Sequence, residues 1–440
     1  MTDLTEKINN IVWGPATIML MLCCGIYFTV KTNFFQIRHF KDVIKKTLFS
    51  SSKKNKGKVS SFQAVSAALA GTIGTGNIAG VATSIALGGP GAVFWMVVSA
   101  FFGMMTKYAE VLLAVKFRTK NSKGEYSGGP MYYMEKGLGL QSLGIIFSIL
   151  LALSAFGIGN MVQSNSVSAA LADSFGIKPK ASGIFITLIC FFVIIGGGKK
   201  ILSATEIIVP VMALFYMAGT VIFLVINYKF LPSAITSIIT DAFDFSNAIG
   251  GVSGFAVSKA VKFGITRGVF TNEAGLGSSP VAHASADISS PSEQGLWGIF
   301  EVFFDTVIMC TLTALVILTA DGGKTARSGL SGMELTISAF ECVFGEAGGI
   351  FISISIIFFA VATILGWGLY GEKAVLYLFK ENTTALFIYK ILYITAIYIG
   401  SIMSLNTVWT VSDTLNGLMA IPNICTLFFL REYVTEEIKK

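Results

Sequence analysis

One apolar run, from Phe62 to Leu87, is interrupted in its middle by four glycines, two threonines and an asparagine within Gly71–Gly80. The run is long enough to cross a bilayer, which takes about 20 residues. Its glycine-rich middle is a poor continuous helix. Non-helical backbone is tolerated at membrane depth only where it is buried in protein or lines a cavity. We therefore predict a broken membrane helix.

A break of this kind leaves backbone groups without helical partners. Free N–H groups at the start of the outer half attract a carboxylate, and free carbonyls at the end of the inner half attract a cation such as Na⁺. We interpret the stretch as half of a binding site for a small zwitterion and its coupling ion. The alternative is that the glycines let another helix pack closely, but this leaves Asn77 and the threonines unexplained.

The rest of the chain is also strongly apolar. It is 53% hydrophobic and 13% charged, whereas soluble domains are about 25% charged, and its mean hydropathy is +0.72. These values predict an all-α polytopic membrane protein, with the lipid bilayer as its surroundings. The net charge of +7 does not indicate nucleic acid, because the basic residues cluster in short loops beside the spans. The six cysteines show no spacing typical of zinc or disulfides.

Eleven apolar runs predict eleven transmembrane helices. They are 11–30, 62–87, 92–117, 143–172, 182–197, 202–227, 246–268, 296–319, 348–379, 386–405 and 407–430. The basic loops Lys31–Lys58 and Arg118–Lys123 are cytoplasmic by the positive-inside rule, so the N-terminus is outside and the C-terminus inside. Residues 33–49 read as an amphipathic surface helix, and Thr271–Pro280 as an inner loop.

Two of these runs occupy matching positions once the first helix is set aside. The first and sixth of the remaining ten, 62–87 and 246–268, are both glycine-interrupted and run in opposite directions. Paired interruptions of this kind point to an inverted-repeat transporter and its binding site, although chance placement is the alternative. We therefore predict Gly254 and Phe255, at the second interruption, as substrate contacts. The predicted units are 1–61 (the extra helix and a basic segment), 62–228 and 229–430 (the two five-helix repeats), and 431–440 (a cytoplasmic tail).

Several charged residues lie in or beside the spans. Glu301 and Asp305 share one helix face, and such carboxylates are either functional or paired with a lysine or arginine. Lys107 and Glu110 are expected at an interface. Asp413 is expected to begin the last helix, as an outer-gate hydrogen bonder or as an acid that complements the helix dipole.

Several short motifs follow one another along nearly the whole chain. They are Gly74–Gly80 with Gly89–Gly91, Gly128–Tyr133, Gly159–Gln163, Arg267–Ser278, Thr363–Trp367 and Asp413–Met419. Together they resemble the alanine or glycine:cation symporter family. The resemblance implies the LeuT-type fold of two inverted five-helix repeats, preceded here by one extra helix. It also implies Na⁺-driven uptake of alanine or glycine across a bacterial or archaeal plasma membrane, with Na⁺ as coupling ion and no organic cofactor.

The resemblance also implies where the substrate binds. The substrate carboxylate would meet the backbone amides of Thr75, Gly76 and Asn77, which follow Gly74 at the break. Gln163 on the third core helix would help bind the substrate, with Asn160 one turn earlier. The alternative for this pair is hydrogen bonding between helices.

A sodium site follows from the same resemblance. The carbonyls of Ala70, Ile73 and Ala360 and the hydroxyl of Thr363 would supply its ligands. LeuT itself has two adjacent hydroxyl residues at the last position, whereas here alanine and isoleucine flank Thr363. A second sodium site would lie near Thr72, Asn77 and Asp305.

Other functions fit the sequence less well. A proton-coupled or exchange transporter would use Asp305 in place of Na⁺, and glutamine or serine is an alternative substrate. A channel would need a continuous pore or repeated filter loops. An enzyme would need a catalytic constellation, and the two histidines, His39 and His283, are expected in distant loops. The chain is therefore not expected to be an enzyme, and its oligomeric state stays open.

Overall fold

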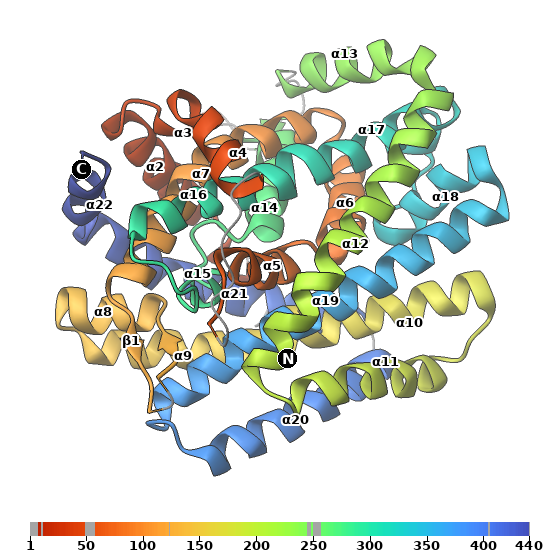
Figure 1. The fold of residues 1–440 in the computed structure, drawn as a ribbon. Helices are drawn as coiled ribbons and strands as arrows, with labels where there is room; N and C mark the ends of the chain where they lie inside the picture. Colours follow the sequence, from red (N-terminus) through yellow and green to blue (C-terminus); the bar gives the residue numbers. More distant parts are fainter. Residues whose placement is uncertain are drawn as a thin grey trace.

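The computed structural model describes residues 8–9, 12–48, 58–122, 124–243, 248–249, 257–403 and 405–439, and helices dominate it (Figure 1). Within this part of the chain, six helices are long and apolar enough to cross a membrane. They are α7 (Gly91–Lys116), α9 to α10 (Gln141–Phe175), α12 (Gly198–Ile226), α16 to η6 (Pro291–Gly323), α19 (Glu346–Leu378) and α20 (Thr383–Ile402). Two pairs bent by 58° raise the number to eight: α5 (Ser61–Thr72) with α6 (Ala79–Gly88), and α21 (Leu405–Phe429) with α22 (Arg431–Lys439).

The remaining elements are shorter. The helices are α2 (Pro15–Lys31), α3 (Phe35–Arg38), α4 (Phe40–Leu48), α8 (Pro130–Leu138), α11 (Pro179–Ile194), α13 (Leu231–Ala242), α14 (Lys259–Asn272), α15 (Pro280–His283) and α18 (Gly332–Phe344). Two antiparallel strand pairs are β1 (Thr119–Lys120) with β2 (Tyr126–Ser127), and β3 (Ala248–Ile249) with β4 (Val257–Ser258).

The multi-pass helical architecture agrees with the sequence. The expected spans 11–30 and 182–197 correspond to the shorter apolar helices α2 and α11. The expected span 246–268 includes residues outside the described part, 246–247 and 250–256, and it ends within α14, so the total of eleven stays a prediction. The loop expected at Thr271–Pro280 is present as the non-helical segment 273–279 between α14 and α15, but every residue from 271 to 286 is buried. The small and polar residues that suggested a loop are instead packed inside the protein.

The first helix break is built by its local sequence. Ser60 and Gln63 form a capping box that starts α5, and two reciprocal hydrogen bonds of this kind fix a helix N-terminus. The helix ends at Thr72, a short 3₁₀ turn η1 (Thr75–Asn77) follows, and α6 continues at an angle of 58°.

A second interrupted helix lies beside the first. The chain leaves α14 at Glu273, Gly275 and Gly277, whose φ angles are +56°, +94° and +79°. Glycine adopts such angles freely, but a glutamate rarely does. After this turn α15 packs against α5, while α14 packs against α6 (Figure 1). The two interrupted segments, 73–78 and 273–279, are therefore neighbours in the middle of the molecule.

Two long helices enclose the broken pair. Helix α5 packs against both α12 and α19. The approach of α19 is close, because a Cβ added to Gly366 would lie 2.6 Å from the backbone nitrogen of Gly71. This seam between α5 and α19 places Thr363 beside the break.

Candidate functional site

The break exchanges helical hydrogen bonds for side-chain contacts. In an unbroken helix the Gly74 amide would bond the Ala70 carbonyl. Here it donates to Asn77 Oδ1 at 3.0 Å. The Thr75 amide and hydroxyl both donate to Gln163 Oε1, at 3.3 and 3.1 Å. The break therefore leaves Ala70 without its usual helical donor, and it ties Thr75 to another helix.

Gln163 reaches the break because its helix is distorted. Between α9 (Gln141–Phe156) and α10 (Val162–Phe175), residues Gly157–Met161 form the π-helical turn η2. Such turns are frequent at functional sites. The amide nitrogen of Gln163 donates to the Ile158 carbonyl at 3.0 Å, which aims Oε1 at Thr75. Asn160 is not brought to the break, because it donates to the Tyr393 carbonyl of α20 at 2.7 Å.

Asn77 connects the break to a second π-helical segment, η5 (Phe303–Cys310), in the middle of the helix that runs from α16 (Pro291–Val302) to α17 (Thr311–Thr319). The amide nitrogen of Asn77 donates to Asp305 Oδ1 at 2.7 Å and to the Asp305 carbonyl at 3.2 Å. The other carboxylate oxygen of Asp305 accepts from the Thr306 hydroxyl at 2.8 Å. A fully buried carboxylate therefore lies directly beside the break.

The end of α14 covers Gly76. A Cβ added to Gly76 would lie 3.0 Å from Thr271 Cγ2 and 3.7 Å from Phe270 Cδ1. Phe270 stacks on Trp409, with ring centroids 5.6 Å apart, and Arg267 Nη1 lies 3.9 Å from Asp413 Oδ2 just beyond this stack. These side chains form a lid over the break.

The sequence predicted Phe255, rather than Phe270, as the phenylalanine that contacts the substrate. Gly254 and Phe255 lie outside the described residues. Phe270 was missed, although its place in the Arg267–Ser278 motif was a usable signal. Asp413 does not begin the last helix, as the sequence suggested, because α21 starts at Leu405 and Asp413 lies two turns inside it.

The predicted sodium ligands meet at the seam between α5 and α19. The Thr363 hydroxyl lies 3.4 Å from the Ile73 carbonyl and donates to the Phe359 carbonyl at 2.9 Å. Ala360 is buried one turn earlier on α19. Neutral carbonyl and hydroxyl oxygens suit a hard cation such as Na⁺. Thr72 instead bonds within its own helix, to the carbonyls of Ala68 and Leu69.

A buried charge network supports the second interrupted segment. Glu301 lies 2.8 Å from His283 Nε2 and 3.6 Å from Lys107 Nζ, and all three side chains are fully buried. Lys107 also donates to Ser279 Oγ at 2.6 Å. Glu301 is thus paired with a lysine, one of the two alternatives that the sequence left open.

Two expectations from the sequence are wrong here. Lys107 and Glu110 are fully buried rather than interfacial, and Glu110 accepts a hydrogen bond from Asn423. His283, expected in a loop, is buried in α15. These charged and polar residues were expected near a membrane surface because hydropathy takes no account of buried partners that are distant in sequence.

Comparisons with known proteins agree along the whole chain. The sequence profile of the sodium:alanine symporter family matches residues 1–440. The chain is 45% identical to the sodium/alanine symporter AgcS of Methanococcus maripaludis, covering 99% of this chain and 96% of that one. It is 37% identical to the probable sodium/glutamine symporter GlnT of Bacillus subtilis, over 98% and 88% of the two chains.

A solved structure shares this fold. A Na⁺-coupled sialic acid symporter, in a substrate-bound outward-open state, superimposes with a TM-score of 0.59 over 96% of this chain and 86% of that one. The two sequences are 14% identical, so this likeness concerns the fold, which is of the LeuT type.

Proposed function

Because the chain belongs to the sodium:alanine symporter family, we propose that it carries alanine or glycine into the cell together with Na⁺. It is a multi-pass membrane protein and a cation-coupled amino-acid transporter, not an enzyme. We place its N-terminus outside the cell and its C-terminus in the cytoplasm, from the basic loops.

One observation carries the proposal: the break between α5 and α6 has groups of both kinds that a zwitterion and a cation need. The amides from Thr75 to Asn77 lie at the start of the second half-helix, where a carboxylate is favoured, and in this structure the Asn77 amide donates to the Gly74 carbonyl at 3.1 Å. Gln163 already occupies part of this place with its side-chain oxygen. We propose that the substrate carboxylate replaces that contact, and that the amide nitrogen of Gln163 then helps to hold it.

The lid over Gly76 favours a small side chain. Thr271 and Phe270 come within 3.0 and 3.7 Å of where a Cβ on Gly76 would lie, which leaves little depth on that side. The name of the relative from Methanococcus maripaludis supports alanine. That of the relative from Bacillus subtilis keeps glutamine as the alternative.

We propose that Na⁺ binds the carbonyls of Ala70, Ile73 and Ala360 and the hydroxyl of Thr363. An ion there would join the broken helix to α19 and hold the break in the form that accepts substrate. A second ion near Asn77 and Asp305 would neutralise the buried carboxylate, which accepts hydrogen bonds from the neutral side chains of Asn77 and Thr306. Thr72 would join that site only if its hydroxyl turned away from its own helix.

The experiment is uptake of labelled alanine into proteoliposomes with and without an inward Na⁺ gradient, for the wild type, Gln163→Ala and the control Ser166→Ala. Ser166 is on the same helix but bonds only the Val162 carbonyl. We expect Na⁺-dependent uptake that falls at least about tenfold in Gln163→Ala, the scale of a lost hydrogen bond to a charged group. Uptake driven by a pH gradient and indifferent to Na⁺ would instead support proton coupling through Asp305.

A further inference from the structure

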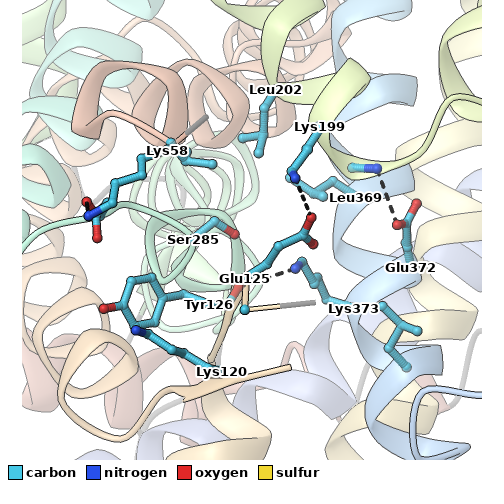
Figure 2. Close-up of a pocket in the computed structure, with 15 residues that line it drawn as sticks. Lys58, Lys120, Glu125, Tyr126, Lys199, Leu202, Ser285, Leu369, Glu372 and Lys373 are labelled. Atoms are coloured by element: carbon cyan, nitrogen blue, oxygen red, sulfur yellow. Dashed lines mark hydrogen bonds and ion pairs between the residues drawn. The ribbon is translucent and has the colours of Figure 1, made fainter. Parts of the chain in front are cut away.

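A separate cavity of about 220 Å³ opens where α12 begins and α19 ends (Figure 2). At about 30 Å³ each it has room for about seven water molecules, which is ample for a small amino acid. It lies on the side that the basic loops assign to the cytoplasm. Its lining comes from the segment before α5, the β1–β2 hairpin, the start of α12, the segment after α15 and the last turns of α19.

Two buried polar groups face this cavity with unused capacity. Ser285 is 6% exposed, and its hydroxyl has no hydrogen-bond partner, although buried hydroxyls are nearly always paired. Lys373 is 7% exposed and donates to the Tyr126 carbonyl and Ser127 Oγ, both at 3.3 Å. Among the described residues its ammonium forms no ion pair within 4.0 Å, and a buried charge without a partner is costly. Both groups suit the carboxylate of a ligand.

The same cavity also presents negative charge. Glu125 is paired with Lys199 at 2.9 Å, and Glu372, on the α19 wall (Figure 2), is paired with Lys390 at 3.2 Å. Burial acts to raise the pKa of Glu125, but hydrogen bonds from Lys199 and Asn121 and the charge of Lys373 bring it below its ordinary value. Glu125 is therefore ionised at neutral pH. The lining holds four lysines (Lys58, Lys120, Lys199 and Lys373) and three carboxylates (Glu125, Asp287 and Glu372), so a zwitterion finds a partner for each of its two charges.

Helix α19 connects the cavity with the break. Helix α19 carries Thr363 and, ten residues later, Lys373, a distance of about 15 Å at 1.5 Å per residue. Between them the seam with α5 is closed by two hydrogen bonds. Trp367 Nε1 donates to the Gly71 carbonyl at 3.3 Å, and the Tyr370 hydroxyl to the Ala68 carbonyl at 3.2 Å. If α5 swings away from α19, the break opens directly into the cavity.

We propose that this cavity is the release-side binding site for the transported amino acid, which it receives as a zwitterion before release to the cytoplasm. The substrate carboxylate binds Lys373 and the Ser285 hydroxyl, and the substrate ammonium binds Glu125. In the empty cavity, Lys199 neutralises Glu125. This inference rests on the proposed function, because it takes the transported amino acid as its ligand.

The test compares the two faces of the membrane. Right-side-out and inside-out vesicles are prepared from cells that express the wild type, Lys373→Met or Ser285→Ala, and the half-saturating alanine concentration is measured in each. On the cytoplasmic face we expect it to rise about tenfold in Lys373→Met and about threefold in Ser285→Ala, the scale of a charged and a neutral hydrogen bond. On the outer face both variants should stay within about twofold of the wild type.

Lys200→Met is the matched control, because Lys200 neighbours Lys199 but donates to the Phe192 carbonyl outside the cavity. Ser285→Ala removes a hydroxyl with no partner, so it keeps the test valid even if Lys373→Met does not fold. Unchanged cytoplasmic constants in Ser285→Ala and any folded Lys373→Met overturn the cavity site alone. Absence of alanine uptake by the wild type overturns the proposed function and this site with it. If inorganic phosphate competes with labelled alanine on the cytoplasmic face as strongly as unlabelled alanine does, the cavity is a general anion site. That result would overturn the proposal that it binds a zwitterion.

Discussion

Gly74 and Gly80 lie six residues apart in the same broken helix, but their surroundings differ. A Cβ added to Gly74 would lie 2.7 Å from Thr363 Oγ1, whereas one added to Gly80 would meet nothing within 4 Å. A contact below 3.0 Å forces something to move, and here the moving group is a proposed sodium ligand. At the residue scale, Gly74 is therefore required for the approach of Thr363 to the Ile73 carbonyl.

We predict that Gly74→Ala raises the half-saturating Na⁺ concentration for uptake at least about tenfold, or abolishes uptake. Gly80→Ala should transport like the wild type, because alanine in a helix is favoured over glycine by roughly 0.5–1 kcal/mol. The measurement is alanine uptake against Na⁺ concentration, with fluorescence-detected size exclusion to confirm folding. Equal Na⁺ dependence in the two variants would contradict a sodium site at Thr363.

At the element scale, the second interrupted segment depends on a buried charge network. Residues 273–279 have left the helix inside the protein, so their polar groups need partners there. Ser279 is held by Lys107, and Lys107 lies beside Glu301. Breaking a buried ion pair by removing one partner leaves an uncompensated charge. The network therefore holds the segment in the conformation that aims α14 at Gly76.

Lys107→Gln is expected to lower the stability of the protein by about 3–5 kcal/mol, because it removes the lysine that lies 3.6 Å from the buried Glu301 carboxylate. The matched control is Lys116→Gln on the same helix, whose partly exposed ion pair with Glu437 is 3.5 Å long, a type worth about 1 kcal/mol or less. Thermal unfolding in detergent compares the two. A midpoint in Lys107→Gln no lower than in Lys116→Gln would mean that Glu301 is not ionised.

The elements show what the sequence predicted and what it did not. The broken helix at Gly71–Gly80 and the place of Gln163 followed from glycine content and a motif. The burial of 271–286 did not, because small and polar residues read as a loop unless their distant partners, such as Lys107, are known. The β1–β2 hairpin was missed for a related reason: its two-residue strands are fixed by contacts with Arg118 and Lys373 rather than by strand propensity.

At the scale of the whole molecule, the two proposed ligands, Na⁺ and substrate, bind to the same helix break between α5 and α6. Na⁺ would connect the break to α19 by binding Ile73 and Thr363, and the substrate carboxylate would bind the neighbouring backbone amides. Each ligand then pre-orders part of the site that the other needs. Coupling of this kind is a free energy shared by two sites and must be the same in both directions.

We therefore predict that a saturating concentration of alanine lowers the dissociation constant of Na⁺ by the same factor by which saturating Na⁺ lowers that of alanine, about 5- to 150-fold. Thermal unfolding of the purified protein over a grid of Na⁺ and alanine concentrations measures both constants, because a ligand that binds the folded state raises its stability by RT ln(1 + [L]/Kd). Gly74→Ala should reduce the factor toward one while alanine still binds. If stabilisation by Na⁺ and alanine is simply additive in the wild type, the two ligands are not coupled through the helix break. Coupling would then have to arise elsewhere in the transport cycle.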